Sequence, residues 1–282
     1  MKLIMTLLVR DEEDILKENI DFHLSQGVDF IIATDNCSID GTKDILLEYQ
    51  NKGLLHYIYE AEDNYNQHKW VTKMARIAYN DYHADWIINN DADEFWYSEE
   101  YNNLKEAFLS LDNSYNIVQA ERNNFVALED RNDDLPFYSQ MIFKEVQSLN
   151  PIGKPLPPKQ AHIGTSNIIV TQGNHAVKNL NNKRIKHNLI KILHFPIRNH
   201  KQLINKIAKG GAAYERNNEL SPNIGNTWRN LYNQLKENGN LDKYLANNMY
   251  SKKRLKTELN SNTLIEDTFL ENYFIKLYQN DH

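Results

Sequence analysis

An acidic cluster follows one of the apolar runs of the sequence. Residues 86–96 read WIINNDADEFW, so Asp91 and Asp93 come directly after an apolar segment. Side chains two positions apart in an extended segment point to the same side, and hard divalent cations such as Mg²⁺ and Mn²⁺ prefer carboxylate oxygens. We therefore expect Asp91 and Asp93 to share one divalent cation. A solvated acidic turn is the alternative interpretation of the tripeptide alone.

Polar residues also follow two other apolar runs. The first run ends in Arg10, Asp11 and Glu12, and the second ends in Asp35 and Asn36. A carboxylate in such a place can accept hydrogen bonds from a base or a ribose. Taken alone, the first group is also typical of the charges at a helix N-terminus, and the second is typical of a turn.

The positive charges of the chain are gathered in its second half. Of the 282 residues, 1–150 hold 12 basic and 29 acidic side chains, whereas 151–282 hold 20 and 9, and the total charge is −6. The 69 residues between Glu145 and Glu215 contain no carboxylate and 11 Lys or Arg. A mildly acidic total argues against general nucleic-acid binding, although a basic segment can meet phosphates locally. We expect a small anion as the partner and no nucleic acid.

These groups need a sheet that brings the ends of several strands together. Apolar runs and helical patterns alternate over the first hundred residues, which predicts an α/β fold with a mostly parallel sheet and helices on both faces. Ligands of such sheets bind outside the carboxyl ends of the strands. The predicted strands are 2–9, 30–33, 56–59 and 85–89, and the predicted helices are 14–25, 42–51 and 70–82.

The pattern changes after residue 112. A loop or edge is expected at 150–158, because its prolines exclude a helix. We expect an α/β half at 1–112, a β-rich half of the same domain at 113–199, and a helical extension at 200–282. The predicted strands of the middle segment are 115–126, 138–146, 161–171 and 189–197, and the later helices are 200–214, 228–237, 241–249 and 266–278.

The composition sets further limits. The length fits one large domain, and the single cysteine excludes an intrachain disulfide or a multi-cysteine zinc site. The sequence contains neither a stretch of about 20 apolar residues nor a secretory cleavage site, so a cytoplasmic protein is expected. The basic segment 250–256 could touch anionic lipid as a peripheral contact, or it could be a solvated helix turn.

Together, the three strand ends resemble those of family 2 glycosyltransferases of the GT-A, Rossmann-like fold. The resemblance rests on LLVRDEEDIL, ATDNCSIDGT and NNDADEFW, taken in this order, and on the branch whose acidic motif reads D-x-D-E-F. The segments QGNHAV at 172–177 and LHFPIR at 193–198 are similar to the G-N-H and H-x-P-x-R elements of that branch. The resemblance spans residues 1–210.

The resemblance implies an inverting, metal-dependent sugar transferase of cell-surface polysaccharide synthesis. The donor would be a nucleotide diphosphate sugar, with UDP as the expected nucleotide, and the acceptor a glycan or a lipid-linked glycan. Asp91 and Asp93 would hold Mn²⁺ or Mg²⁺ on the diphosphate, and His194 in its neutral form would complete the metal site. The residues near the nucleotide would be Arg10, Asp11, Glu12, Asp35 and Asn36.

The implied reaction asks for further groups. Negative charge develops on the leaving diphosphate, and Arg198 and Lys206 are the cations expected to stabilise it beside the metal. The acceptor hydroxyl needs a general base. The carboxylate that serves most family 2 enzymes has no obvious counterpart, and we expect Glu94 or His175 in this role, with Glu121 as a further candidate.

Two other functions use the same residues differently. A metal-dependent nucleotidyltransferase or phosphohydrolase would use the same carboxylates and would release pyrophosphate or phosphate. A carbohydrate-binding module without catalysis would use the aromatic segments 95–97 and 137–138 as stacking platforms. In that case the carboxylates would be structural.

Overall fold

A computed structural model describes residues 1–132, 134–150 and 153–279. The chain folds into two compact units. The first unit comprises Met1–Arg122 and Leu156–Leu193, and the second comprises Asn123–Pro155 and His194–His282. The predicted β-rich segment 113–199 is therefore divided between the two units, whereas the predicted helical extension 200–282 lies in the second.

An eight-stranded sheet forms the centre of the first unit, in the order β3-β2-β1-β4-β8-β6-β11-β5. Strands β3, β2, β1 and β4 are parallel, so their carboxyl ends lie at the same edge. Strand β8 is antiparallel to both of its neighbours. The bounds are β1 Leu3–Val9, β2 Phe30–Asn36, β3 Leu55–Glu60, β4 Trp86–Asp91, β5 Glu94–Tyr97, β6 Ile117–Asn124, β8 Lys159–Ile163 and β11 Ile185–His194.

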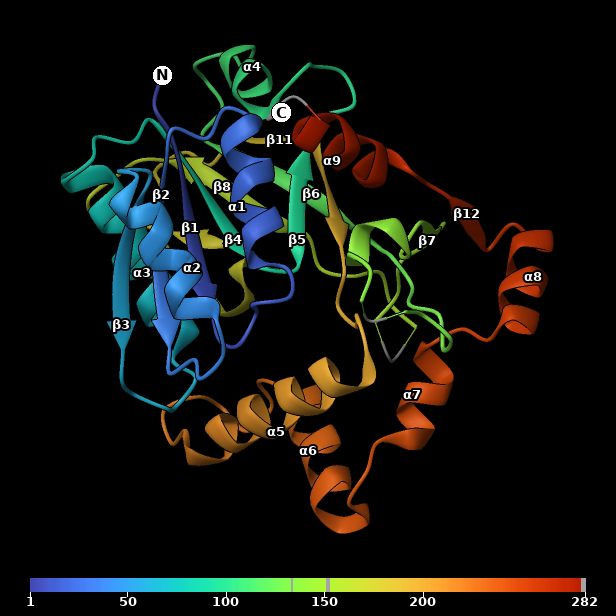
Figure 1. Cartoon of the computed structure of the whole chain (residues 1–282). Helices are drawn as coiled ribbons and strands as arrows, with labels where there is room; N and C mark the ends of the chain where they lie inside the picture. Colours follow the sequence, from blue (N-terminus) through green and yellow to red (C-terminus); the bar gives the residue numbers. More distant parts are fainter. Residues whose placement is uncertain (133, 151–152, 280–282) are drawn as a thin grey trace. The chain divides into compact units, whose positions relative to one another are not determined.

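Helices cover both faces of the parallel strands. In Figure 1, α1 and α2 lie in front of these strands and α3 lies behind them. The apolar face of α3 carries Met74 into one core with Ile4 of β1 and Ile32 of β2. The predicted α/β class, with a parallel sheet in the first hundred residues, is thus confirmed. The remaining elements of this unit are α1 Leu16–Ser25, α2 Thr42–Asn51, α3 Gln67–Asn80, α4 Leu104–Leu109, the hairpin of β9 Ile169–Val170 and β10 Val177–Lys178, and the 3-10 turn Gln172–Asn174.

Helices predominate in the described part of the second unit. Two glycines let α5 and α6 approach closely: a Cβ atom at Gly210 would lie 2.3 Å from the ring of Trp228, and one at Gly211 would lie 2.3 Å from Tyr232. A separate apolar cluster joins Val126 to Phe143 of β7 and Leu264 of β12, two strands that pair in the antiparallel sense. The elements are the 3-10 turn Phe137–Ser139, β7 Phe143–Glu145, α5 His200–Arg216, α6 Asn226–Asn238, α7 Asp242–Asn248, α8 Lys252–Asn260, β12 Leu264–Glu266 and α9 Phe269–Gln279.

Two predicted strands of the later half are wrong in extent. The segment 138–146 begins in a 3-10 turn and is extended only at β7, and the segment 161–171 is divided between β8 and β9. The reason is pairing at a distance, since β7 pairs with β12 more than a hundred residues later. Within the expected loop 150–158, residues 151 and 152 lie outside the described residues, and 153–158 contain no helix.

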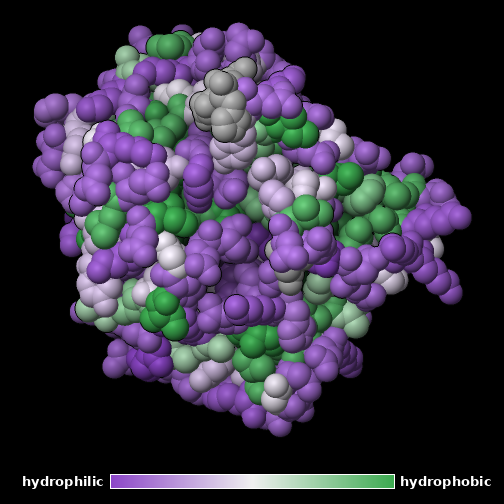
Figure 2. Space-filling view, viewed as in Figure 1, coloured by the Kyte–Doolittle hydropathy of each residue, from purple (hydrophilic) through white to green (hydrophobic). Residues whose placement is uncertain are grey.

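No helix in the described ranges is both long and apolar enough to cross a bilayer. Hydrophilic residues cover most of the face shown in Figure 2, and the hydrophobic residues on it form separate groups.

Candidate active site

The acidic cluster begins where the parallel strand β4 ends. Asp91 is the last residue of β4 and lies beside Leu8 of β1 in the sheet. Ala92 and Asp93 form a turn, and β5 starts at Glu94. The extended alternation expected to align Asp91 with Asp93 is therefore wrong, because the chain turns between them. The turn itself lies at the carboxyl end of the parallel strands, where open α/β sheets bind ligands.

A buried lysine contacts this acidic turn. Lys159, the first residue of β8, is only 1% exposed. Its ammonium group pairs with Asp91 Oδ2 and lies 3.3 Å from Glu94 Oε1. Asn174 Nδ2 donates a hydrogen bond to Asp91 Oδ1 at 3.1 Å. Both carboxylate oxygens of Asp91 thus have a partner within the protein, although 30% of its side chain is exposed.

Glu94 is the most buried carboxylate of the cluster. Arg122 Nη1 lies 3.4 Å from Oε1, the oxygen that Lys159 also approaches. The other oxygen, Oε2, is buried and has no hydrogen-bond partner among the described residues. Burial raises the pKa of Glu94 to about 7, against the lowering effect of the Lys159 and Arg122 charges. A group with this pKa exchanges a proton near neutral pH.

The loop that carries Asn174 is anchored on the first turn of α3. Gln67 Oε1 accepts a hydrogen bond from Gly173 N at 2.6 Å. Asn174 adopts a left-handed conformation with φ of 61° and is buried. Its amide nitrogen is used by Asp91, but its Oδ1 has no hydrogen-bond partner in the part of the chain that is described. This oxygen is a candidate contact for a bound ligand.

His175 lies in the same loop and is held in its neutral form. Its Nδ1 donates to the Pro158 carbonyl at 2.9 Å, because that oxygen can only accept. Burial, and after it the positive charge of Lys159, lowers the pKa of His175 to about 4. The imidazole fills the space beside Gly173, where a Cβ atom would lie 2.6 Å from Nε2.

Two buried polar residues of α1 hold the acidic turn. Asn19 Nδ2 donates to the carbonyl of Ala92 at 2.9 Å and to that of Glu94 at 2.8 Å. One turn later, His23 Nδ1 donates to the Asn19 carbonyl at 2.7 Å, and Nε2 accepts from Trp96 N at 3.2 Å. Burial lowers the pKa of His23 to about 4, so the ring is neutral at pH 7. Helix α1 thus holds the backbone of residues 92–96, the segment that carries Asp93 and Glu94.

The ends of β1 and β2 are bonded to each other. Asp11 Oδ1 accepts from Ile39 N at 2.8 Å, and Asp11 N donates to Ser38 Oγ at 2.9 Å. Asp35 is buried, and its two oxygens accept from Ser38 N at 3.0 Å and from the Tyr57 hydroxyl at 3.3 Å. The expected contacts of Asp11 and Asp35 with a nucleoside stay predictions.

The other polar residues at these strand ends also have protein partners. Arg10 Nη1 pairs with Asp63 at 2.5 Å, and Glu12 N donates to Thr42 Oγ1 at 2.9 Å. Asn36 Nδ2 donates to two backbone carbonyls at the end of β3. These bonds connect the ends of β1, β2 and β3.

Three residues predicted for the site belong to the second unit. His194 Nδ1 bonds Asn124 Oδ1 at 2.7 Å. Arg198 is fully buried, and its Nη1 donates to the Phe195 carbonyl at 3.3 Å. Lys206 lies on α5. The metal-binding role of His194 and the phosphate-binding roles of Arg198 and Lys206 stay predictions.

Most of the aromatic residues expected as stacking platforms belong instead to the core. Phe95 and Trp96 are fully buried, and the ring of Phe95 packs edge-on against Phe22 at 5.4 Å. In the second unit, Phe137 is buried against Phe195 at 5.0 Å between ring centroids. These three buried rings offer no face to a sugar, whereas Tyr138 is partly exposed and packs against Phe274 at 4.6 Å, so a stacking role for Tyr138 stays a prediction.

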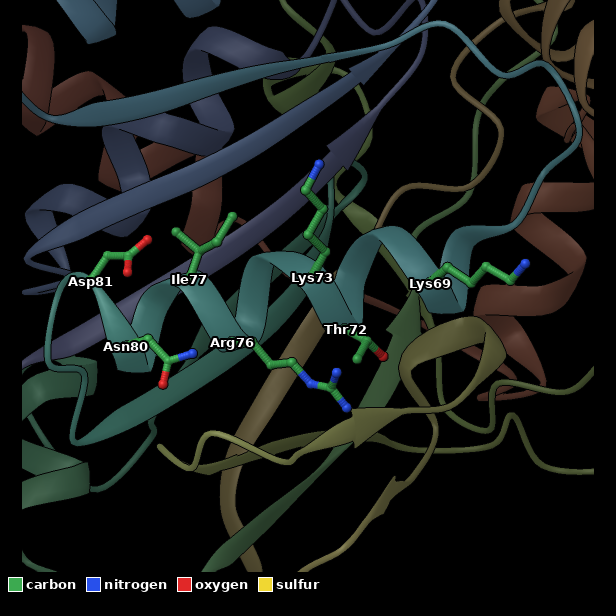
Figure 3. Close-up of a pocket in the computed structure, with 7 residues that line it drawn as sticks. All are labelled: Lys69, Thr72, Lys73, Arg76, Ile77, Asn80 and Asp81. Atoms are coloured by element: carbon green, nitrogen blue, oxygen red, sulfur yellow. The ribbon is translucent and has the colours of Figure 1, made fainter.

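A pocket of about 420 Å³ lies along α3, and Figure 3 shows its lining residues. Two of its cations, Lys73 and Arg76, extend to opposite sides of the helix in this view. The Arg76 guanidinium is fixed by a bond from Nε to the Ile168 carbonyl at 2.9 Å. These charges do not converge on one point, so the pocket is not a candidate anion site. The lining residues are Lys69, Thr72, Lys73, Arg76, Ile77, Asn80 and Asp81.

Sequence reasoning missed three residues that the structure brings to the acidic turn. Lys159 and Arg122 come from strands of the antiparallel half of the sheet, and Asn19 lies on α1, more than seventy positions before its backbone partners. One signal was available for Lys159, since it lies in the long segment without carboxylates.

Comparisons with known proteins give one family match and several similar solved structures. A family model described as glycosyltransferase family 92 matches residues 5–262, and no curated protein matches the sequence. S. aureus TarS is similar with 15% identity and a TM-score of 0.38, over 58% of this chain but only 28% of the TarS chain. S. aureus TarS 1-349 in complex with UDP-GlcNAc is similar with 12% identity and a TM-score of 0.44. The similarity covers 84% of this chain and 73% of the TarS 1-349 chain.

Glucosyl-3-phosphoglycerate synthase from Mycobacterium tuberculosis, in complex with Mn²⁺, UDP and glucosyl-3-phosphoglycerate, is similar over 43% of this chain and 44% of its own. Its identity is 13% and its TM-score is 0.28. Similarities of this size do not transfer the ligands of these proteins to the present chain.

Proposed function

Because this chain belongs to glycosyltransferase family 92, we propose that it transfers a sugar from a nucleotide diphosphate, UDP as the first choice, to a glycan or lipid-linked acceptor. Membership of this family shows that the chain is a glycosyltransferase, the class that the sequence resemblance also implies. The resemblance to a branch of family 2 is not confirmed. The observation that supports a nucleotide diphosphate donor is the acidic turn of Asp91 and Asp93 at the carboxyl end of β4. Inversion at the sugar carbon remains part of the proposal.

The donor set of this turn suits a divalent cation. Carboxylate oxygens are hard ligands, and the partly exposed side chain of Asp91 can be reached from solvent. Mg²⁺ or Mn²⁺ bound by Asp91 and Asp93 would neutralise the charge that develops on the leaving diphosphate. Asn19 contributes by holding the turn in one conformation, so that both carboxylates are oriented before the donor binds.

The first test is the exchange of each carboxylate for its amide. We expect Asp91→Asn and Asp93→Asn each to lower kcat by about a hundredfold or more, since a missing electrostatic stabiliser typically costs this much. The measurement is nucleoside diphosphate release from a panel of nucleotide sugars with Mn²⁺, with unchanged melting temperatures as the sign of an intact fold. Full activity of both variants in excess chelator would overturn the metal role.

The same assay separates the alternative chemistry. Release of pyrophosphate or free phosphate in place of nucleoside diphosphate would identify a nucleotidyltransferase or a phosphohydrolase, which uses the same carboxylates.

The general base is tested by comparing its two candidates. Glu94 is ion-paired with Lys159 and Arg122, whereas His175 is neutral and half-buried. In Glu94→Gln and His175→Gln, the variant that lacks the base should lose transfer to the acceptor while it keeps donor binding. Equal donor affinity in both variants makes the comparison direct.

A further inference from the structure

Lys159 brings a positive charge to the place where a divalent cation is expected. The residue is 1% exposed, and its ammonium group lies between carboxylates of two different strands, Asp91 at the end of β4 and Glu94 at the start of β5. A buried ammonium ion needs such partners, because burying a charge without compensation is costly. The lysine is therefore a built-in counter-ion of the acidic turn.

The ion pair and a metal ion make competing demands on Asp91. Its Oδ2 pairs with Lys159, and its Oδ1 accepts from Asn174. A divalent cation would need at least one of these oxygens and would lie within a few ångströms of the ammonium group. Two cations at such a distance repel each other strongly in a site of low dielectric constant. Lys159 must therefore move away from Asp91 when a metal binds there.

Glu94 offers the position to which the lysine can move. Its Oε1 already lies 3.3 Å from the ammonium nitrogen. Its Oε2 is buried and has no hydrogen-bond partner among the residues that the structure describes. A buried acceptor without a donor is unfavourable, so a small movement of Lys159 toward Oε2 would satisfy it.

We propose that Lys159 is an exchangeable counter-ion, which pairs with both Asp91 and Glu94 in the metal-free protein and with Glu94 alone when a divalent cation occupies Asp91. This inference rests on the proposed function, because it concerns the same metal site. Its consequence is that the lysine weakens metal binding and neutralises the carboxylates whenever the metal is absent. The site is then regulated by a competing charge of the protein itself.

The test is a Mn²⁺ titration followed by the EPR signal of free Mn²⁺, at fixed ionic strength and without any sugar nucleotide. We expect Lys159→Met to bind Mn²⁺ at least tenfold more tightly than the natural protein, since the competing charge is gone. Lys159→Arg keeps the charge and should stay within about threefold of the natural protein. Lys178→Met, which removes an exposed lysine of β10, is the matched control and should change nothing.

An affinity of Lys159→Met that is unchanged or weaker would overturn the proposal. Should this variant unfold in metal-free buffer, Lys159→Gln keeps one donor for Asp91 and replaces it in the titration. Refolding of either variant on addition of Mn²⁺ supports the exchange, and failure to refold with Mn²⁺ contradicts it. The result is independent of sugar transfer, so a protein that binds Mn²⁺ as expected but transfers no sugar would refute the proposed function alone.

Discussion

At the scale of single residues, the loop 172–175 depends on one glycine. Gly173 has a φ of 76°, and the imidazole of His175 occupies the space in which its Cβ atom would lie. A side chain at position 173 is therefore unfavourable for two reasons. The backbone conformation is left-handed, and the His175 ring lies too close to the position of a Cβ atom. The next residue of the same loop, Asn174, donates a hydrogen bond to Asp91. A change of the backbone at Gly173 is therefore expected to disturb this hydrogen bond to the acidic turn.

We expect Gly173→Ala to be more destabilising than an alanine placed in the same backbone conformation elsewhere. Gly53 has a φ of 73° and nothing within 4 Å of its ideal Cβ position, so Gly53→Ala measures the conformational cost alone, about 1–2 kcal/mol. The clash with the His175 ring should add about 1–3 kcal/mol at Gly173. Urea denaturation of both variants measures the difference, and equal losses would contradict the role given to the ring.

Lys159 shows why part of the site was out of reach of the sequence. It follows a proline-rich loop and begins β8, and neither periodicity nor spacing connects it with Asp91, which lies 68 positions earlier. The contact exists because β8 pairs with β4 in the antiparallel sense. Asp91 and Asp93, in contrast, could be predicted, because an apolar strand that runs directly into carboxylates is visible in the sequence itself.

At the scale of elements, α1 serves the site with its polar side chains as much as with its apolar ones. Asn19 and His23 are both buried and both bond the segment that follows β4. Both lie among the buried residues of the helix, yet the sequence pattern does not indicate that they act as hydrogen-bonding groups. Their partners in that segment are backbone atoms, whose position the sequence does not indicate, and Asn19 Oδ1 also accepts from Asn90 Nδ2 at 3.0 Å.

His23 makes the stability of the protein depend on pH. Its pKa is lowered by burial to about 4 in the folded protein, while an unfolded histidine has a pKa of about 6.5, so the unfolded chain binds the extra proton in this window. The free energy of unfolding should therefore fall as the pH drops from 6.5 to 4. One histidine of this kind contributes up to about 1.4 kcal/mol per pH unit.

In the variant His23→Gln, the free energy of unfolding should change less steeply with pH. The difference is up to about 1.4 kcal/mol per pH unit, which corresponds to one proton, whatever the effect of the variant on stability at pH 7. His187→Gln removes an exposed imidazole on β11 and is the control for the loss of a histidine outside the core. Denaturant titrations between pH 4 and pH 7 provide the measurement. An unchanged slope in His23→Gln would mean that the ring takes up its proton in the folded protein.

The bounds of elements were predictable where local chemistry sets them. The helix 42–51 was predicted with its observed ends, because the side chain of Asp40 accepts from Thr42 N in the turn that precedes it. The strand β7 was overestimated, because a three-residue pairing with β12 decides its length. Long-range pairing likewise sets the extent of β8, which pairs with β4.

At the scale of the whole molecule, the basic segment 250–256 carries less free charge than its sequence suggests. Lys252 on α8 pairs with Asp130 at 2.7 Å, and the Arg254 guanidinium lies 3.8 Å from the centre of the Tyr250 ring. Both are occupied within the second unit. Lys253 and Lys256 are exposed on α8 and remain the candidates for a contact with anionic lipid.

We propose a cytoplasmic protein with this peripheral contact, and vesicle sedimentation tests it. Binding to vesicles with a third of phosphatidylserine should fall about tenfold or more in the double variant Lys253→Glu/Lys256→Glu, at about 1 kcal/mol per lysine near a membrane surface. The same exchange at two exposed lysines of the first unit, Lys43→Glu/Lys73→Glu, keeps the net charge equal. Equal losses in the two double variants would show that only the total charge matters.

The strands of the first unit are not synthesised in the order in which they lie in the sheet. Strand β8 lies between β4 and β6, yet it is made after both, beyond the excursion of residues 123–155 into the second unit. In a chain emerging from the ribosome, the edges of β4 and β6 that face β8 therefore stay unpaired at least until Ile163 has been synthesised, and open edges can pair with wrong partners. Lys159 arrives with that same strand, so during synthesis the carboxylates of the acidic turn stay without their counter-ion until the sheet closes.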